Sequence, residues 1–510
     1  MKIVGSDTMA RIDRESRERY AIPSIIQMEN AGIKAWSAVR SASRGGPLPG
    51  ARMVFAAGRG NNGGDALIMA RQAFLEGARE ISVILAGGRP EAASDPAVDL
   101  AMCESLGIAC VDYPARAEQC RGLLEAADWV FDGVAGTGIR GALRPPLAAL
   151  VDLMNAAPAR RVAIDVPSGV REGFHPGDPA LRAELTLTMG LPKTCLYLPH
   201  TRPLCGRIVV VRVGFPPALV EDPAIAGETL DTRSWRGLLR PIPSEAHKGT
   251  RGHLAVFAGS PGTTGAAWLC AQAAARSRVG LVSLFLDHSV YPLLAPRLQS
   301  VMARPWDMVP AQGPGSSGAP DLSPFDGLLV GPGWGLSEER VGLLESLAAS
   351  GLPGVIDADG LVLLARLWSR GAGQPLGGKW VLTPHPVEFS RLAGVSKEET
   401  LADPLAHALE AARRFDAVVV LKGACTHIAS PSGRFWILDG CNPALATGGS
   451  GDVLAGIIAG GIAGGMPALD AALFGVSLHA RVGWAARRQM GWFLAEDLLP
   501  LISRSLGRAP

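Results

Sequence analysis

The residues best suited to chemistry stand where apolar segments give way to glycine. In the C-terminal half, Ala446 to Gly456 reads ATGGSGDVLAG, and Gly448, Gly449 and Gly451 precede an apolar segment of helical character. Backbone N–H groups at such a helix start bind phosphates. No Lys-Ser/Thr follows the glycines, so this is not a Walker A loop. Asp452 either stabilises the helix dipole or orients an attacking hydroxyl in phosphoryl transfer, and we favour the catalytic role.

Three more segments of this half end apolar runs with polar groups. GPGWG, from Gly331, predicts a close-approach turn, and TPHPVEF places His385 between two prolines, which favours a ligand contact over a core position. Lys422 and Gly423 follow the apolar run DAVVVL. A lysine there either extends to solvent or meets a phosphate, and only the nearby Asp452 motif favours the phosphate.

The N-terminal half has three comparable strand ends. GRGNNGGDA, from Gly58, brings glycines, amides and Asp65 to the start of a helix, although an Asn-Gly turn with a capping Asp is an equal alternative. DGVAGTGIRGA, from Asp132, predicts an anion-binding concavity of backbone amides. IDVPSG ends in Asp165 and Ser168, which suit oxygen coordination or helix capping. Three such ends together favour a site over three separate turns.

The elements that position these motifs are alternating strands and helices. Apolar strand-like runs begin at Arg52, Ile81, Asp128, Arg160, Glu184 and Arg207 in the first half, and at His253, Leu281, Asp326, Pro353, Lys379 and Asp416 in the second. Helical segments such as residues 66–77 and 97–107 separate the strands, which predicts mostly parallel sheets. CTHIAS and RFWILDG predict a hairpin through Pro431. The proline-rich stretch 215–244 is the expected domain boundary, and AQGPGSSGAP, from Ala311, an expected flexible loop.

Composition narrows the function classes. The chain has 510 residues, of which 48% are hydrophobic and 19% charged, so it is not a disordered chain. Its formal net charge of +2 argues against a protein that neutralises nucleic-acid phosphates. Eight separated cysteines with no C-x-x-C disfavour a zinc or redox motif and predict reduced thiols in the cytoplasm. The N-terminus has no signal-like segment, and the apolar run from Val453 to Leu469 is too short for a membrane span.

The motifs of the first half resemble the NAD(P)H-hydrate epimerase (YjeF N-terminal) family. MENAG at Met28, GNNGGD, DGVAGTG and DVPSG occur in this order, and Ala66 stands where the family usually has Gly. The resemblance implies that the hydrated dinucleotide contacts Asn61, Asn62, Gly63, Gly64, Asp65, Gly136, Thr137, Gly138, Ile139, Arg140, Gly141 and Ala142. It also implies that Asp165 binds substrate and handles protons, and that Asn62, Asp132 and Ser168 hold K⁺. Lys193, in GLPKT, is a candidate partner, although a solvated loop lysine is favoured.

The motifs of the second half resemble the ADP-dependent NAD(P)H-hydrate dehydratase family, which has a ribokinase-like fold. HKGTRGHLAVFAGS, GPGWG, DADGL, TPHPVEF, LKGACT and TGGSGD carry this resemblance. It implies that the AMP part of ADP contacts Lys422, Gly423, Ala424, Cys425, Thr426 and Gly451, and that the hydrated dinucleotide faces Ala266, Gly333, His385 and Asp452, the base. Arg278-Val279-Gly280 replaces a usual Gly-Ala-Gly, and the usual Pro-Glu-Val-Met is absent near Met302, which puts substrate-side details in question.

Together these resemblances imply a bifunctional repair enzyme. A Rossmann-like α/β domain, residues 1–220, would epimerise the R and S forms of hydrated NADH and NADPH. A ribokinase-like α/β domain, residues 228–510, would dehydrate the S form with ADP and Mg²⁺, giving AMP and phosphate. The expected partners are these small molecules, in a homo-oligomer without nucleic acid or membrane. Two alternatives stay open: a true sugar or vitamin kinase in the second half, and a non-catalytic module in the first.

Overall fold

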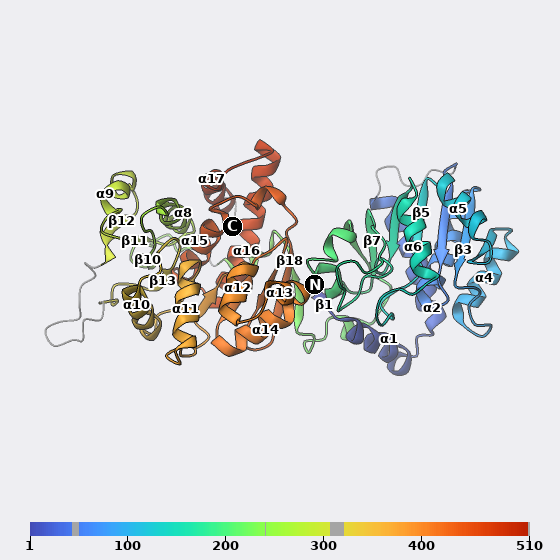
Figure 1. Ribbon diagram of the computed structural model, residues 1–510, viewed down its shortest axis with the longest axis horizontal. Coiled ribbons are helices and arrows are strands. Elements are labelled where there is room, and N and C mark those ends of the chain that lie inside the picture. Colours follow the sequence, from blue (N-terminus) through green and yellow to red (C-terminus); the bar gives the residue numbers. More distant parts are fainter. Residues whose placement is uncertain (43–49, 240, 307–320, 508–510) are drawn as a thin grey trace. The chain divides into compact units, whose positions relative to one another are not determined.

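The computed structural model divides the chain into two compact units, which we describe separately (Figure 1). Unit 1 is Met1–Gly227 and unit 2 is Glu228–Pro510. The structure describes residues 1–42, 50–239, 241–306 and 321–507. The expected flexible loop at 311–320 lies outside these residues.

Seven strands of unit 1 form a parallel sheet in the order β4-β3-β2-β5-β6-β7-β8. The order changes direction between β2 and β5, and ligands of open α/β sheets bind at such a switch point. The strands are β2 (Met53–Ala57), β3 (Ile81–Ala86), β4 (Ala109–Tyr113), β5 (Trp129–Gly133), β6 (Arg160–Ile164), β7 (Leu185–Met189) and β8 (Arg207–Val211). The helices include α1 (Ser6–Tyr20), α2 (Ser24–Ala42), α3 (Asn61–Leu75), α4 (Asp95–Ser105), α5 (Ala117–Ala126) and α6 (Leu147–Ala156).

The apolar strands of unit 1 are covered on both faces. Every residue of β2 is buried, and its side chains alternate between two core clusters because successive strand residues point to opposite faces. Phe55 of β2 stacks on Phe131 of β5, with ring centroids 4.3 Å apart, on the face that carries α2 and α3. This two-sided burial is the physical reason that the strands are continuously apolar in sequence.

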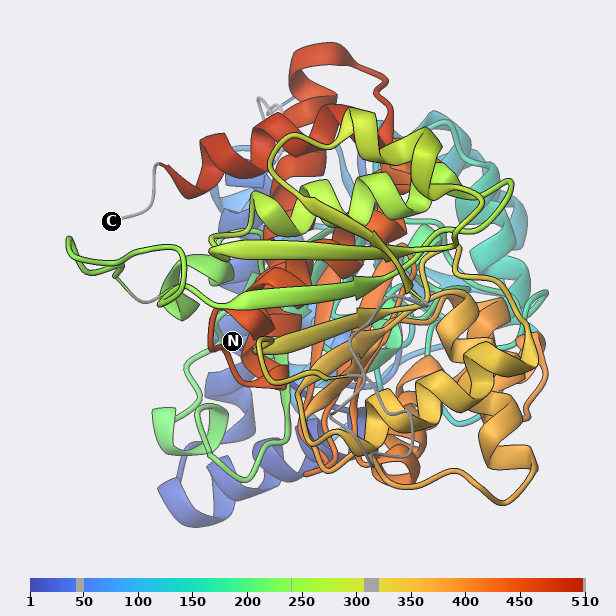
Figure 2. The same ribbon diagram turned by 90° about the vertical axis from the view of Figure 1, so that its left-hand side faces the viewer.

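The sheet of unit 2 runs β9-β18-β17-β16-β15-β14-β13-β10-β11-β12, with helices on both faces (Figure 2). From β16 to β12 each neighbouring pair is parallel, whereas β16, β17 and β18 pair antiparallel. Its strands are β9 (Gly227–Leu230), β10 (His253–Phe257), β11 (Leu281–Leu286), β12 (Met302–Pro305), β13 (Gly327–Val330), β14 (Gly354–Ile356), β15 (Trp380–Leu382), β16 (Val418–Leu421), β17 (Cys425–Ala429) and β18 (Phe435–Asp439).

Two helices on one face of the unit 2 sheet pack at very short range. A Cβ added to Gly456 of α15 (Ser450–Ala463) would lie 2.2 Å from the carbonyl oxygen of Cys270 in α8 (Thr264–Ala275), so only glycine permits this contact. The other helices include α10 (Glu338–Ala349), α11 (Asp359–Ser369), α12 (Pro386–Ala393), α13 (Lys397–Ala402), α14 (Pro404–Phe415), α16 (Ala468–Met490) and α17 (Ala495–Leu506).

The apolar run that begins at Val453 belongs to two helices and not to one. It covers most of α15, breaks at the glycines before Pro467, and enters α16. Within the described residues, no helix combines the length and the apolar character that crossing a bilayer requires.

The sequence missed short elements at the edges of the sheets. β4 and β12 are edge strands, and their mixed composition gives a weak strand signal. The boundary segment is also more ordered than expected, since it contains α7 (Pro217–Val220), β9 and the 3₁₀ helix η3 (Ser234–Leu238). Trp235 of η3 is fully buried in the core of unit 2.

Candidate active sites

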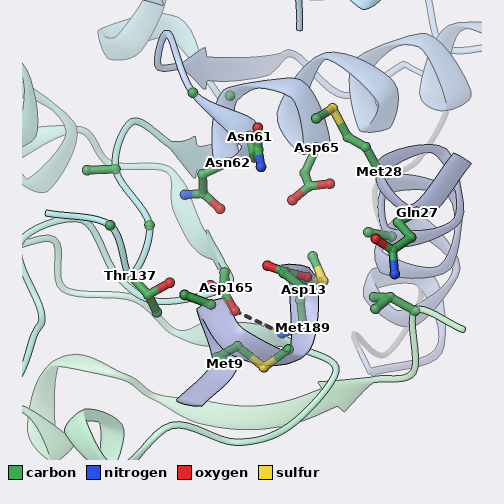
Figure 3. Close-up of a pocket in the computed structure, with 18 of the residues that line it drawn as sticks. Met9, Asp13, Gln27, Met28, Asn61, Asn62, Asp65, Thr137, Asp165 and Met189 are labelled. Carbon is green, nitrogen blue, oxygen red and sulfur yellow. Dashed lines mark hydrogen bonds between the residues drawn. The ribbon is translucent and has the colours of Figure 1, made fainter. Parts of the chain in front are cut away.

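A pocket of about 520 Å³ lies at the carboxyl ends of the unit 1 strands, beside the switch point (Figure 3). Most residues that the sequence assigned to the first site line it: Asn61, Asn62, Gly63, Asp65, Gly136, Thr137, Gly138, Ile139 and Asp165. Four other predicted substrate contacts lie outside its lining: Arg140, Gly141 and Ala142, which are exposed, and Gly64, which is buried. Asp132 and Ser168 are fully buried and also lie outside the lining.

Gly63 and Gly64 of GNNGGD are required by close contacts at the start of α3. A Cβ on Gly63 would lie 1.8 Å from the carbonyl oxygen of Gly58, and one on Gly64 would lie 2.2 Å from the Met28 sulfur. The same helix buries Ala66, whose methyl group would be 2.7 Å from a Cβ on Gly133. The MENAG, GNNGGD and DGVAGTG motifs therefore meet at close range, because these glycines leave no room for a side chain of their own.

Asp132 and Ser168 form one buried hydrogen-bond network. The Ser168 hydroxyl donates to Asp132 Oδ1 at 2.6 Å, and its backbone N–H donates to Oδ2 at 2.8 Å. Burial raises the pKa of Asp132 to about 6, although the hydrogen bonds from Ser168 oppose the rise. The amide nitrogen and oxygen of Asn62 are buried without a hydrogen-bond partner. An unsatisfied buried amide is unusual, and its oxygen is available to a cation.

Asp165 forms an ion pair with Lys193, which corrects the expectation of a solvated lysine. Lys193 is 1% exposed, and its ammonium group donates to Asp165 Oδ1, to the Thr188 hydroxyl at 3.2 Å and to the Met189 carbonyl at 2.6 Å. Three acceptors satisfy its three donors, so the charge is stable in the interior. Asp165 itself has φ of 66°, which turns the chain at the end of β6 toward the pocket.

Sequence reasoning missed Asp13, which reaches the same pocket from α1. Figure 3 shows Asp13 pointing toward Asp165 and Asp65 from the opposite wall. Burial raises the pKa of Asp13; Lys193 lowers it, and Asp165 raises it further. Burial raises the pKa of Asp65 well above its usual value, with the charges of Asp165 and Asp13 adding to the effect. The sequence did carry one indication of this role, because Asp13 stands next to Ile12, on the buried face of an amphipathic helix.

In unit 2, Asp452 lies in the first turn of α15, as the glycine pattern predicts. Gly449 precedes the helix with φ of 89°, a conformation that favours glycine, and a Cβ there would strike Leu269 of α8 at 2.4 Å. The pKa of Asp452 is raised to about 7, mainly by burial and then by the Asp357 carboxylate, although the charge of Lys422 opposes the rise. A carboxyl group with this pKa can exchange a proton at neutral pH.

Lys422 connects the acids of this second site. Its ammonium nitrogen lies 2.9 Å from Asp357 Oδ1 and 3.7 Å from Glu388 Oε2, and a Cβ on Gly451 would lie 3.4 Å from it. Burial lowers the pKa of Lys422, but Asp357 and Glu388 outweigh that effect and the pKa rises. The sequence motifs contain both acids, yet their role was missed because their strands are separated along the chain.

His385 caps α12, beside the same charged group. Its Nδ1 accepts hydrogen bonds from the backbone N–H groups of Val387 and Glu388, and Nε2 lies 3.4 Å from Glu388 Oε1. The backbone N–H of Lys422 donates to the Pro384 carbonyl at 2.8 Å, so the turn before α12 is joined to the end of β16. The imidazole is thus held by its first nitrogen, and the His385 side chain as a whole is about half exposed.

The GPGWG turn approaches the start of α8. Gly331, Gly333 and Gly335 all have positive φ, and the Gly333 carbonyl accepts from the hydroxyls of Ser260 at 3.0 Å and Thr263 at 2.7 Å. Thr263 precedes α8, whose first turn contains the partly buried Ala266. The structure therefore brings Gly333 close to the helix that carries Ala266, and packing at Gly449 brings α8 to the start of α15.

Two family models match the chain, one in each unit. The model described as NAD(P)H-hydrate dehydratase matches residues 254–504, and that of the YjeF-related protein N-terminus matches residues 24–195. The bifunctional NAD(P)H-hydrate repair enzyme of Moorella thermoacetica is 35% identical, covering 99% of this chain and 97% of its own. That of Escherichia coli is 30% identical, covering 98% and 93%. A Bacillus subtilis ADP/ATP-dependent NAD(P)H-hydrate dehydratase, co-crystallised with ATP and Mg²⁺, is 28% identical over 55% of this chain and 99% of its own, with a TM-score of 0.48.

The matches define a two-domain α/β enzyme that acts on hydrated nicotinamide nucleotides. This chain belongs to the family of bifunctional NAD(P)H-hydrate repair enzymes, with an epimerase domain followed by an ADP-dependent dehydratase domain. The predicted function is therefore confirmed, and the largely parallel sheets of both units confirm the predicted α/β fold class.

Proposed function

We propose that Asp452 is the base of the dehydratase reaction and that Lys422 and the amides before α15 receive the phosphates of ADP. The observation that carries this assignment is a carboxyl group of pKa about 7 at a glycine-lined helix start beside a buried lysine. Asp452 would take the proton of the ring hydroxyl as that oxygen attacks the terminal phosphorus of ADP. AMP leaves, and loss of phosphate together with a proton from the adjacent ring carbon then gives NAD(P)H.

The remaining contacts of this site position the two substrates. We assign the segment of Lys422, Gly423, Ala424, Cys425 and Thr426, with Gly451, to the AMP part of ADP, and Ala266, Gly333 and His385 to the hydrated dinucleotide. Asp357 and Glu388 supply hard oxygen ligands of the kind that Mg²⁺ prefers, and both contact Lys422. A bound Mg²⁺ would neutralise phosphate charge in the transition state. Lys422 would move from its carboxylate partners to the nucleotide as they engage the ion.

In the epimerase domain we propose that Asp165 and Lys193 act as a pair on the hydroxyl-bearing ring carbon. The buried lysine orients the carboxylate toward the pocket and stabilises its charge when it gives up a proton. We assign K⁺ to Asn62, Asp132 and Ser168, because the donors are all oxygens and the Asn62 amide is buried without a partner. Bound K⁺ would add a fixed positive charge for the dinucleotide phosphates.

One assay separates this function from the sugar or vitamin kinase. The enzyme is mixed with both epimers of hydrated NADPH, ADP and Mg²⁺, with K⁺ or with Na⁺, and the return of reduced-nicotinamide absorbance is followed. We expect complete conversion of both epimers, slower for the R form when Na⁺ replaces K⁺, with AMP and phosphate as products. A stable phosphorylated product, or conversion of half of the mixture in K⁺, would contradict the assignment.

The remaining assignments are also proposals. We propose a homo-oligomeric, cytoplasmic enzyme whose domains span residues 1–220 and 228–510. Sedimentation of the purified protein tests the oligomeric state directly.

A further inference from the structure

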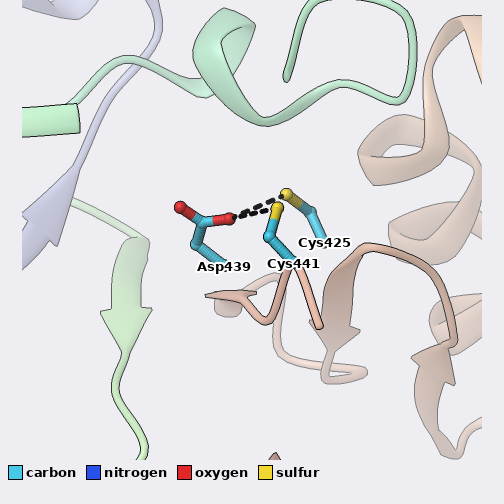
Figure 4. A group of neighbouring side chains, drawn as sticks. All are labelled: Cys425, Asp439 and Cys441. Carbon is cyan, nitrogen blue, oxygen red and sulfur yellow. Dashed lines mark hydrogen bonds between the residues drawn. The ribbon is translucent and has the colours of Figure 1, made fainter. Parts of the chain in front are cut away.

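Two cysteines that are distant in sequence meet at the end of the β17–β18 hairpin. The sulfur of Cys425, the sulfur of Cys441 and a carboxylate oxygen of Asp439 all lie within 4.8 Å of one another (Figure 4). Both sulfurs approach the same oxygen, since Asp439 Oδ1 is 2.9 Å from the Cys441 sulfur and 3.7 Å from the Cys425 sulfur. The spacing Cys-x₁₃-Asp-x-Cys is not a familiar zinc pattern, and it becomes a cluster only through the hairpin.

The backbone holds the three residues in place. Cys425 and Asp439 face each other in the antiparallel register. The N–H groups of Gly440 and Cys441 both donate to the Ala424 carbonyl, at 3.1 and 2.9 Å, and the Trp484 indole donates to the Gly440 carbonyl at 3.1 Å. Cys441 has φ of 36°, a conformation that non-glycine residues adopt rarely, and this turn directs its side chain toward Asp439.

We propose that Cys425, Asp439 and Cys441 bind a divalent zinc ion. Two thiolates and one carboxylate are zinc ligands, and water would complete a four-coordinate site. Sulfurs at about 2.3 Å from zinc in a tetrahedral site are ~3.8 Å apart, so the two sulfurs need to move together by about 1 Å or less. A sulfur and an oxygen ligand are about 3.5 Å apart in such a site, so the 2.9 Å contact between Cys441 and Asp439 would lengthen. The ion replaces the two thiol protons, which are released to solvent. Cys425 is buried but Cys441 is partly exposed, which gives the ion a route of entry.

The placement of Asp439 favours a metal over a disulfide. A carboxylate that contacts both thiols supplies charge for a cation, whereas a disulfide would remove both S–H donors and leave the carboxylate beside two sulfur atoms. The hard oxygen ligand also favours Zn²⁺ over Cu⁺, which prefers sulfur alone. The three ligand atoms differ from the carboxylates around Lys422, and Cys425 alone also belongs to the segment that we assign to the AMP part of ADP.

Cobalt titration tests the site, because Co²⁺ substitutes for zinc and absorbs light when it binds thiolates. Co²⁺ is added to the reduced full-length protein, and the thiolate-to-cobalt band in the near ultraviolet is recorded before and after Zn²⁺ is added. We expect the band to saturate at a single ion per chain and to disappear with Zn²⁺. Absence of the band in the reduced protein overturns the proposal.

Substitutions distinguish this cluster from the other thiols. Cys441→Ser should weaken Co²⁺ binding at least tenfold, and Asp439→Asn should weaken it while keeping the thiolate band. Cys110→Ser, at a partly exposed cysteine of unit 1, is the matched control and should bind as the parent does. Circular dichroism confirms that each variant is folded. A band unchanged in Cys441→Ser overturns the proposal, as does thiol counting that shows Cys425 and Cys441 joined in a disulfide while the reduced protein takes up no Co²⁺.

Discussion

The two candidate active sites contain the same kinds of charged group, carboxylates and a lysine, in different arrangements. Each brings three carboxyl groups to one lysine: Asp13, Asp65 and Asp165 around Lys193, and Asp357, Glu388 and Asp452 around Lys422. In the epimerase domain the lysine pairs with the proposed catalytic acid itself. In the dehydratase domain it pairs with Asp357, and among the residues that the structure describes the proposed base forms no ion pair as close.

This difference follows from what each reaction must supply. Epimerisation uses no nucleotide co-substrate beside the dinucleotide, so the protein itself must stabilise the charge of the working carboxylate. Phosphoryl transfer brings phosphates and a metal ion, so a lysine held by neighbouring acids can be transferred to the incoming charge while the base stays close to neutral pKa. The position of the lysine, and not the number of acids, therefore separates the two chemistries.

The largest expected effect comes from Asp452→Asn, which removes the base but keeps the shape of the helix start. Dehydratase turnover should fall by about 10²–10⁴-fold, while ADP binding changes little and epimerisation is unaffected. Recovery of reduced-nicotinamide absorbance measures the first, and calorimetric titration with ADP the second. Turnover equal to that of the parent would disprove the role of Asp452.

Lys193→Met tests the ion pair of the other site. Because it leaves Asp165 without its partner, epimerisation should fall by about 10²-fold, and unit 1 should lose roughly 3–5 kcal/mol of stability. Dehydration of the pure S form should continue at the parent rate. Lys34→Met, at an exposed lysine of the same unit, is the control and should change neither property. An unimpaired epimerase in Lys193→Met would remove the distinction between the two sites.

The pH dependence of dehydration should reveal the raised pKa of Asp452. The base works only after losing its proton, so kcat/KM should rise with pH and level off above about 7. Well below this value the rate should fall about tenfold for each unit of pH. Initial rates measured from about pH 5.5 to about pH 8.5, on both sides of that pKa, test this. A flat profile would show that Asp452 is already ionised throughout.

The smallest expected effect concerns stability and not catalysis. Burial lowers the pKa of His427, on β17, to about 4, below its unfolded value of 6.5. The neutral ring therefore contributes stability above pH 6.5 that is lost as the pH falls toward 4, to a total of roughly 3 kcal/mol. His427→Leu should reduce this acid sensitivity of unit 2. Calorimetric unfolding at about pH 7, above the unfolded pKa, and at about pH 5, between the two pKa values, measures the effect. An identical pH dependence in the variant would contradict the burial effect.

Much of the fold could be predicted because buried parallel strands are continuously apolar and end in recognisable turns. The same patterns located Asp165, Asp452 and Lys422, since each follows a strand end or a glycine cluster. Asp13 and the buried state of Lys193 could not be predicted, because a charged residue in a helix or loop resembles a solvated one until its partners are known. Glu388 and Asp357 required the strand order, which alone brings their segments together.

The burial of Trp235 in the core of unit 2 limits where the chain can be cut to give a separate dehydratase domain. Its backbone N–H donates to the Ser477 hydroxyl at 3.1 Å, and that hydroxyl donates to the Asp231 carbonyl at 2.6 Å. A dehydratase fragment expressed from His247 onward would therefore carry a hole in its hydrophobic interior, of the kind that costs about 3–5 kcal/mol when a tryptophan is deleted. A separate dehydratase domain should therefore begin before Asp231, at the start of β9.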